Sequence, residues 1–379
     1  MIYADFNATY PCSESHLDMV SRVMKKTQGN PSSIHQHGRE ARLVLEESRE
    51  QVARLIGAQR HQLFFTSGAT EANNLALQGV VGRKRGNGPV HVVLSSGEHP
   101  SLLQPAKWLE SVGLIDLNLI RLKPDGQVCP EHLIETIRKD TAFLGLILAN
   151  NETGIINPLD RLIAQIRSLA PDCHIHSDGV QAYGKTDTSW IGSPQGPDSF
   201  SASAHKIGGF KGIGFLYLNN HANLQAMMIG GGQEQRVRSG TENMPGVISF
   251  GLRAREILAC QDWLAPARQA QRELTEGLKS LKGAVIHGDY SDDSSHTHNT
   301  VNFHVNGLSG ETMMLHFDMA DICVSSGSAC SSGQGSPSPV LMAMGYDEDI
   351  ATNSVRVSFG HSSLPEDAKK ILSVLRQLS

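Results

Sequence analysis

Residues 64–77 read FFTSGATEANNLAL, and this stretch passes from one kind of local structure to another. An apolar run ends at the two phenylalanines, small residues fill positions 67–70, and Ala72, Leu75 and Ala76 then recur at helical spacing. A strand that passes directly into a helix is the repeating unit of α/β folds. The stretch therefore predicts a βα unit, and its surroundings decide whether the unit repeats.

The same alternation of apolar runs and helical patterns continues through most of the first 250 residues. Residues 39–57, for example, place apolar or small side chains three or four positions apart as far as Gly57. Short strands alternating with helices predict an α/β domain with a mainly parallel sheet, which we expect over residues 15–255. The strands are expected at residues 63–65, 91–94, 143–149, 174–176, 199–203 and 214–218.

The pattern changes at about residue 255. A helical segment over residues 255–283 precedes several short strand-like pieces and a final helix, residues 365–378. We expect residues 1–14 and 256–379 to form a smaller α+β domain. Its strand-like pieces are residues 284–288, 300–305, 322–326 and 354–359.

Composition excludes several classes of protein. The 379 residues carry a formal net charge of −5, so no overall basic field indicates nucleic acid as a partner. The longest apolar stretch, residues 143–149, is too short to span a membrane, and the N-terminus, with an acid at Asp5, does not resemble a signal peptide. Six cysteines without a CxxC pair do not suggest a disulfide framework. We expect a reduced, cytoplasmic protein without a metal site.

Three polar clusters follow predicted strands. Small residues before a helix, here Ala69 and Thr70, expose backbone N–H groups that suit a phosphate, although a well-capped helix explains them equally well. Asp178 follows the strand at 174–176, where a turn residue is the ordinary alternative. Lys206 lies among small residues, as if the backbone approached something bulky, and a lysine in such a pocket can form a Schiff base. A phosphate site, an acid and a lysine are the parts that pyridoxal phosphate requires.

Motifs along nearly the whole chain resemble one family, the NifS/IscS-like cysteine desulfurases. These are fold-type I, pyridoxal phosphate-dependent enzymes of the class V aminotransferase group. The motifs are YADFNATYP (3–11), GNPSSIH (29–35), TSGATEANN (66–74), GEHPS (97–101), ANNETG (149–154), SDGVQAYGK (177–185), SASAHKIGGFKGIG (201–214), RSGTEN (238–243), SSGSACSSG (325–333) and SVRVSFG (354–360). The SSGSAC form resembles the group whose catalytic cysteine lies in a long mobile loop.

The resemblance implies a role for individual residues. Lys206 would form the Schiff base, Asp178 would pair with the pyridinium nitrogen, and Cys330 would take the sulfur of L-cysteine as a persulfide. For the phosphate, the resemblance implies Ala69, Thr70, Ser203, His205 and, from the other subunit of a homodimer, Thr241. Gln181 and Asn151 would lie near the ring oxygen, and His99 would stack on the ring and serve in proton transfer. Arg356 and Asn151 would bind the substrate carboxylate.

Alternatives to these roles are open at the level of sequence. A histidine after a strand, such as His99, is commonly a turn residue. An interdomain salt bridge is the alternative role for Arg356, which lies in a strand-like run. A selenocysteine lyase or another class V enzyme would use the same cofactor site, and a non-catalytic homologue would be a binding platform.

Cys330 lies in VSSGSACSSGQGSPSP (324–339), a run without apolar periodicity that predicts a mobile loop. Such a loop would carry one sulfur atom between a pocket and an acceptor protein, either an iron–sulfur scaffold or a thiolation factor. The proline-rich continuation departs from the pattern of the family, and this leaves the identity of the acceptor open.

Overall fold

The computed structural model describes residues 1–84, 86, 88–327 and 336–378, and its centre is a seven-stranded sheet. The strand order is β2-β8-β7-β6-β5-β3-β4, and only β8 runs antiparallel to its neighbours. The predicted α/β class with a mainly parallel sheet is therefore confirmed. The strands are β2 (Leu63–Thr66), β3 (Val90–Ser95), β4 (Ile115–Ile120), β5 (Phe143–Gly145), β6 (His174–Asp178), β7 (Ser199–Ser203) and β8 (Gly214–Leu218).

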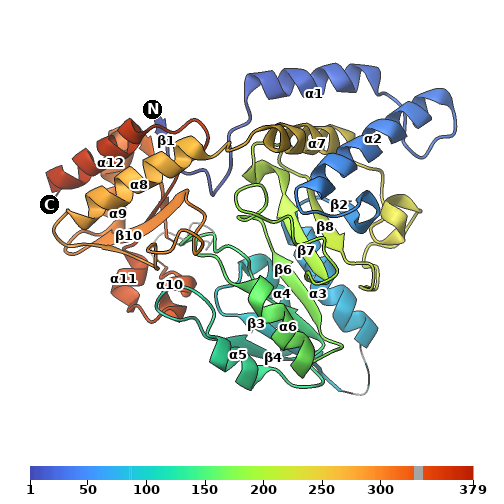
Figure 1. The fold of residues 1–379 in the computed structure, drawn as a ribbon, viewed down its shortest axis with the longest axis horizontal. Helices are drawn as coiled ribbons and strands as arrows, with labels where there is room; N and C mark the ends of the chain where they lie inside the picture. The colour runs from blue at the N-terminus through green and yellow to red at the C-terminus, as the bar shows by residue number, and fades with distance from the viewer. Residues whose placement is uncertain (85, 87, 328–335, 379) are drawn as a thin grey trace.

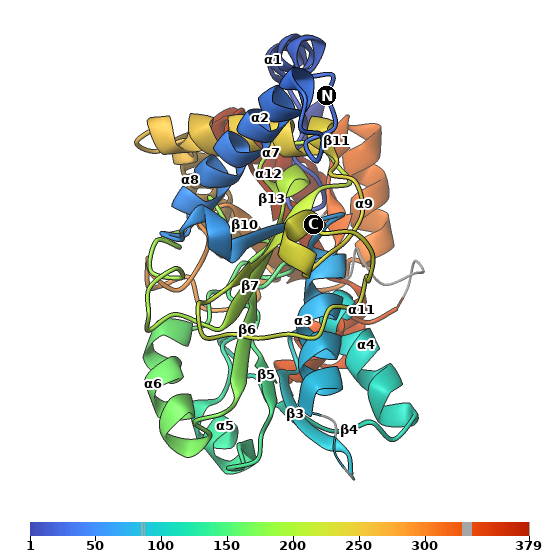
Figure 2. The ribbon, with the colours of Figure 1, turned by 90° about the vertical axis from the view of Figure 1, so that its right-hand side faces the viewer.

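Helices cover both faces of this sheet because successive side chains of each strand point to opposite faces. Phe64 packs with the helices of one face and Phe65 with those of the other. In Figure 2, α3 and α4 lie on one side of the strands and α6 lies on the other. The helices of this part are α1 (Glu14–Lys26), α2 (Gln36–Arg54), α3 (Ala69–Lys84), α4 (Pro100–Ser111), α5 (Pro130–Thr136), α6 (Leu159–Leu169) and α7 (Met244–Ala259).

A second sheet lies beside the first, on the left of Figure 1, together with both chain termini. Its order is β12-β13-β10-β9, its strands are antiparallel, and α8 and α12 pack together over it. The N-terminal strand β1 (Ile2–Tyr3) pairs with β11 (Ile322–Cys323). The other elements here are α8 (Ala265–Lys279), β9 (Ala284–Ile286), β10 (Thr300–Val305), α9 (Gly310–Met319), β12 (Ser325–Ser326), β13 (Val355–Ser358) and α12 (Pro365–Leu378).

Two details differ from the sequence prediction. The helical segment expected over residues 255–283 is interrupted, because α7 ends at Ala259 and α8 begins at Ala265 with a proline in its first turn. Strand β4 was not expected, since polar residues interrupt its apolar pattern at the edge of the sheet.

Two short helices, α10 (Pro339–Ala343) and α11 (Glu348–Thr352), extend the core of the main sheet. Val340, Leu341 and Ala351 are buried in the same cluster as residues of β2 and α6. The remaining short elements are the 3₁₀ turns η1 (Arg60–Gln62), η2 (Ala204–Lys206) and η3 (Gln233–Arg236). None of the helices in the described ranges combines the length and apolarity that crossing a membrane requires.

Candidate active site

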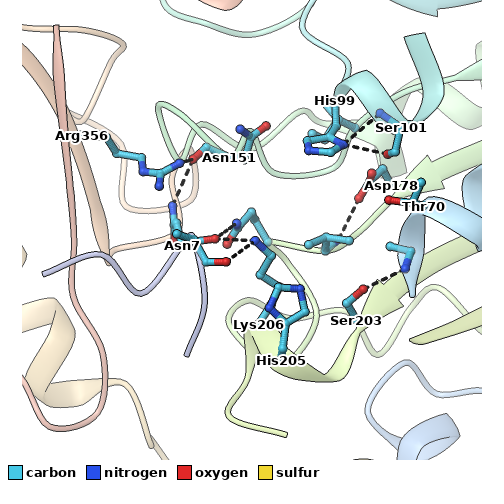
Figure 3. A pocket seen from close by; sticks show the side chains of 15 residues that line it. Asn7, Thr70, His99, Ser101, Asn151, Asp178, Ser203, His205, Lys206 and Arg356 are labelled. Atoms are coloured by element: carbon cyan, nitrogen blue, oxygen red, sulfur yellow. Dashed lines mark hydrogen bonds between the residues drawn. The ribbon is translucent and has the colours of Figure 1, made fainter. Parts of the chain in front are cut away.

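A cavity of about 330 Å³ opens at the carboxyl ends of the parallel strands, where ligands of α/β sheets bind. Figure 3 shows it from close by, with Arg356 at one end and Asp178 and Thr70 at the other. Residues of both sheets and of the N-terminal segment line it. The sequence-predicted residues brought together there are Ala69, Thr70, His99, Asn151, Asp178, Gln181, Ser203, His205, Lys206 and Arg356.

One end of the cavity is formed by the start of α3 and the end of β7. The backbone N–H of Ala69 donates to Ser203 Oγ at 2.8 Å, which joins the two segments. His205, next in the turn, lies near Thr9 Oγ1 at 3.2 Å through its Nδ1. Burial, reinforced by the charges of Lys206 and nearby lysines, lowers the pKa of His205 to about 4. Helix N–H groups, hydroxyls and a neutral imidazole form a donor-rich corner that suits a phosphate.

Asp178 is the last residue of β6 and is 2% exposed. Its Oδ2 accepts from Asn73 Nδ2 at 2.7 Å, and its Oδ1 accepts from the backbone N–H of Val180 at 3.0 Å. These two contacts fix the carboxyl group at the wall of the cavity. The sequence predicts a role for Asp178 but none for Asn73, although both lie within motifs that the prediction used.

Lys206 ends the turn η2, which follows β7 directly. Its Nζ donates to the backbone carbonyls of Asn7 at 2.7 Å and Ala8 at 2.9 Å, so the N-terminal segment holds the amine in the cavity (Figure 3). Gln181 Nε2 donates to the same Asn7 carbonyl at 3.0 Å. The sequence prediction assigned no role to Asn7, because nothing in the local pattern places the N-terminal segment beside β7.

A second lysine, Lys185, contacts both Gln181 and Asn7. Lys185 Nζ donates to Gln181 Oε1 at 2.5 Å and lies 3.4 Å from Asn7 Oδ1. Burial, together with the charges of Lys206 and Arg356, holds the pKa of Lys185 well below its usual range. Lys185 is therefore a buried amine whose neutral form is favoured, and it contacts the same Gln181 and Asn7 that contact each other beside Lys206.

Arg356, in β13, is 1% exposed. Its NH2 group donates to Asp5 Oδ1 at 2.8 Å and its NH1 group to the backbone carbonyl of Asn151 at 3.0 Å. Arg356 therefore forms a salt bridge, although with Asp5 of the same predicted domain and not between the two predicted domains, and it also lines the cavity. Its Nε is buried without a hydrogen-bond partner among the residues that the structure describes. A donor in this state suits an anionic ligand such as a carboxylate.

His99 faces Lys206 from the opposite wall of the cavity (Figure 3). It is the N-cap of α4, and its Nδ1 accepts from the backbone N–H of Ser101 at 3.1 Å. Ser101 Oγ lies 2.8 Å from the same Nδ1. The ring therefore approaches the cavity in an orientation that the start of α4 fixes.

Two buried glutamates near the cavity were not predicted. Burial raises the pKa of Glu152 to about 7, although Ser338 Oγ donates to its carboxylate at 2.5 Å. Burial, and then the charge of Asp178, raises the pKa of Glu98 well above its usual range. Both residues stand inside motifs that the sequence analysis quoted, but burial is a tertiary property and left no local signal.

Two predicted residues are not among the described residues that line the cavity, for different reasons. Thr241 is exposed after η3 and does not line the cavity. Cys330 lies outside the described residues. The described chain resumes at Ser336, and Ser338 is bound to Glu152, the neighbour of Asn151 in the wall of the cavity.

Comparisons with known proteins agree with this geometry. The model of the family "Aminotransferase class-V" matches residues 2–371. The chain is 34% identical over 379 residues to "Cysteine desulfurase IscS" of Dictyoglomus turgidum, covering 100% of this chain and 94% of that protein. It is 36% identical over 380 residues to "Cysteine desulfurase IscS 1" of Archaeoglobus fulgidus, covering 99% and 96%. A solved "NifS-like protein" superimposes with a TM-score of 0.90 at 28% identity, covering 100% of this chain and 98% of the other.

Proposed function

The chain belongs to the aminotransferase class-V family and is a pyridoxal phosphate-dependent cysteine desulfurase, and we propose that it carries the sulfur of L-cysteine as a persulfide on Cys330. The supporting observation is a single cavity in which Lys206, Asp178, the start of α3 and Arg356 converge. A platform that only bound other proteins would have no need of this set of residues. L-cysteine is the substrate, and an acceptor protein receives the sulfur.

The residues of the cavity fit the cofactor. Its phosphate would lie at the start of α3, against Ala69, Thr70 and the side chains of Ser203 and His205. Asp178 would face the ring nitrogen, and Lys206 would hold the aldehyde. Gln181 and Asn151 would lie near the ring oxygen, with His99 stacked on the ring. When bound, the cofactor accepts the electron pair that the substrate releases when it loses its α-proton.

Arg356 would orient the substrate. A guanidinium can bind a carboxylate through two parallel hydrogen bonds, and Arg356, which lines the cavity and whose Nε has no partner among the described residues, would supply them. The carboxylate of cysteine would lie between Arg356 and Asn151, so that its α-carbon faces Lys206. The amine of Lys206, which two backbone carbonyls bind in the structure, would take the α-proton once the substrate has released it from the aldehyde.

Cys330 would receive the sulfur. Its thiolate attacks the substrate sulfur, a new S–S bond forms, and the C–S bond breaks with its electron pair left on the substrate carbon. Protonation of that carbon gives alanine. The persulfide on Cys330 is then attacked by a thiol of the acceptor, such as an iron–sulfur scaffold or a thiolation factor.

Two features of architecture belong to the proposal. Residues 15–255 would form the large cofactor-binding domain, and residues 1–14 and 256–379 the small one that carries Cys330. The active unit would be a homodimer, in which Thr241 reaches the phosphate of the other subunit's cofactor. The exposure of Thr241, and its absence from the cavity of its own chain, support this second point.

The experiment is sulfide and alanine release from L-cysteine with a reductant, comparing wild type, Cys330→Ala and the matched control Cys260→Ala. Cys260 is exposed at the end of α7 and serves as the control. We expect Cys330→Ala to lose both products by about 100-fold or more while it keeps the absorbance of bound cofactor, since the nucleophile alone is gone. The control should keep wild-type rates.

Two results would contradict the proposal. Wild-type release by Cys330→Ala would remove Cys330 as the sulfur acceptor. A wild-type protein that binds no cofactor, or that releases selenium from selenocysteine but no sulfide from cysteine, would favour the platform or the selenocysteine lyase instead.

A further inference from the structure

The hydrogen bonds of His99 determine which of its ring nitrogens carries the proton. Its Nδ1 lies 3.1 Å from the backbone nitrogen of Ser101, and a backbone N–H can only donate. Nδ1 must therefore present its lone pair. In the neutral ring, the proton is then on Nε2.

The side chain of Ser101 adds a second donor to the same nitrogen. Ser101 Oγ, 2.8 Å from Nδ1, itself accepts from Asn73 Nδ2 at 2.8 Å. Because its oxygen receives the hydrogen from Asn73, the hydroxyl hydrogen of Ser101 is directed to His99. Nδ1 thus accepts from two donors of one short segment.

The orientation of Asn73 is fixed by its other contacts. Its Nδ2 donates to Asp178 Oδ2 at 2.7 Å, and a carboxylate can only accept. Its Oδ1 accepts from Ser201 Oγ at 2.5 Å and faces His176 Nε2 at 2.9 Å. Asn73 is completely buried. A flipped amide would place its oxygen against the Asp178 carboxylate, so the hydrogen-bond pattern permits one orientation.

We propose that Asn73 and Ser101 are positioning residues that hold His99 as a neutral imidazole with its proton on Nε2. His99 then meets the reacting sulfur as a hydrogen-bond donor and does not remove the proton of a thiol. This inference rests on the proposed function only in placing His99 beside the substrate. It gives a direction to the proton transfer expected of His99: because Nε2 already holds a proton and Nδ1 is occupied, the ring donates a hydrogen bond and does not accept a proton.

The helix terminus and the nearby cations favour the neutral form of His99. His99 caps the N-terminus of α4, where the helix dipole disfavours a positive charge. Lys206 and Arg356 line the same cavity and add positive charge there, which also disfavours an imidazolium. The carboxylates of Asp178 and, when ionised, of Glu152 act in the opposite direction, and burial raises the pKa of Glu152 to about 7. Among the described residues, the charged or titratable side chains that line the cavity with His99 are Asp178, His205, Lys206 and Arg356.

The direct test is nitrogen NMR of the apoenzyme labelled with ring-¹⁵N histidine, with His99 assigned through its loss in His99→Gln. We expect the His99 signals to show a protonated Nε2 and an unprotonated Nδ1 from about pH 6 to about pH 9. Ser101→Ala should raise the protonation midpoint of His99 by about 0.5 to 1 pH unit, because one hydrogen bond to Nδ1 is lost. The matched control is Ser199→Ala, which removes a buried hydroxyl that contacts His174 and His176 instead.

A comparison of the activities of two His99 variants distinguishes hydrogen-bond donation from a purely structural role. The amide of His99→Gln can donate but is not a base, so it should retain at least about 10-fold more activity than His99→Ala. Equal activities of the two variants would overturn the proposal, as would an imidazolium or a protonated Nδ1 in the wild-type spectrum at neutral pH. The wild-type spectrum alone decides the tautomer if a serine variant fails to fold. Failure of the proposed function would leave this spectrum unchanged, so it can be distinguished from failure of the proposal on the His99 tautomer.

Discussion

Arg356 illustrates how one residue can have a structural and a binding role at once. It pairs with Asp5 through NH2 and with the Asn151 carbonyl through NH1, and it lines the cavity, while its Nε is buried without a hydrogen-bond partner among the described residues. Arg356→Lys keeps the charge but loses the planar array of donors. We expect the KM for L-cysteine to rise by about 10- to 100-fold with a smaller change in kcat, since a charge-assisted hydrogen bond is lost. Steady-state kinetics measures this.

The matched control for Arg356→Lys is Arg268→Lys, in an exposed pair with Asp262. It should leave the KM unchanged, because an exposed ion pair contributes little. An unchanged KM in Arg356→Lys would mean that the salt bridge to Asp5 is the whole role of Arg356.

Glu152 should make stability depend on pH. Its pKa is raised from 4.5 to about 7 in the folded chain by burial, so the folded state binds its proton more tightly than the unfolded state. Its stabilising contribution is complete below about pH 4.5 and is lost as the pH rises through about 7. Glu152→Gln removes this dependence. Relative to wild type, the variant should gain up to about 3 kcal/mol in free energy of unfolding between pH 5 and pH 8.

Urea unfolding of both proteins at the two pH values tests this prediction, with Glu131→Gln as control because that carboxyl is exposed. A difference between wild type and Glu152→Gln that stays constant with pH would contradict it.

The individual residues that sequence could predict are those that follow strands. Asp178 and Lys206 end short apolar runs, and the carboxyl ends of parallel strands meet at one edge of a sheet. Asn73, Lys185 and Glu152 were missed for the opposite reason. Each owes its role to burial among residues distant in sequence, and a polar residue inside a helix or a loop shows no local sign of this.

At the scale of elements, a buried ion pair connects α2, β2 and η3. Arg49 donates to both carboxylate oxygens of Glu234 at 2.6 and 2.9 Å, and the backbone N–H of Phe65 donates to Glu234 at 2.7 Å. Glu234 adopts a positive φ of 42°, which the pair helps to hold. Glu234→Gln would leave the buried guanidinium with only the partly exposed Glu46, 3.3 Å from its Nε, as a counter-charge. We expect a loss of about 3 to 5 kcal/mol in free energy of unfolding, measured by urea titration.

The control is Asp262→Asn, which breaks the exposed pair with Arg268 and should cost less than about 1 kcal/mol. Equal effects of the two variants would show that the buried pair is not needed to hold η3.

Elements with strong periodicity were predictable, and those with a weak local pattern were not. β3 and β8 are buried throughout and are largely apolar, whereas β4 lies at the sheet edge with mixed exposure. The sequence shows no clear sign of the break between α7 and α8, because the pattern of apolar residues is similar in both helices. Local pattern alone does not show where a helix ends when neither segment changes composition.

At the scale of the whole molecule, the sequence predicts a mainly parallel sheet and a second group of strand-like pieces, but not how the two parts are joined. The N-terminal segment spans both parts, since β1 pairs with β11 while the Asn7 carbonyl accepts from Lys206. Helices α10 and α11, distant in sequence from the main sheet, pack against its core. Contacts between segments so far apart depend on the assembled fold, so a local pattern does not reveal them.

The proposed homodimer makes each active site depend on two chains, and this can be tested by mixing inactive variants. Lys206→Ala removes the amine from its own cavity, and Thr241→Asp would place a carboxylate beside the phosphate in the partner's cavity. In a hybrid dimer, one site would carry both changes and the other neither. Unfolding and refolding the two variants together should restore about a quarter of wild-type sulfide release, because about half of the dimers are hybrids with one intact site each. The control is Lys206→Ala refolded with Lys206→Ala,Thr241→Asp, which assembles no intact site and should remain inactive. If the first mixture also remains inactive although light scattering shows dimers, Thr241 does not act across the interface.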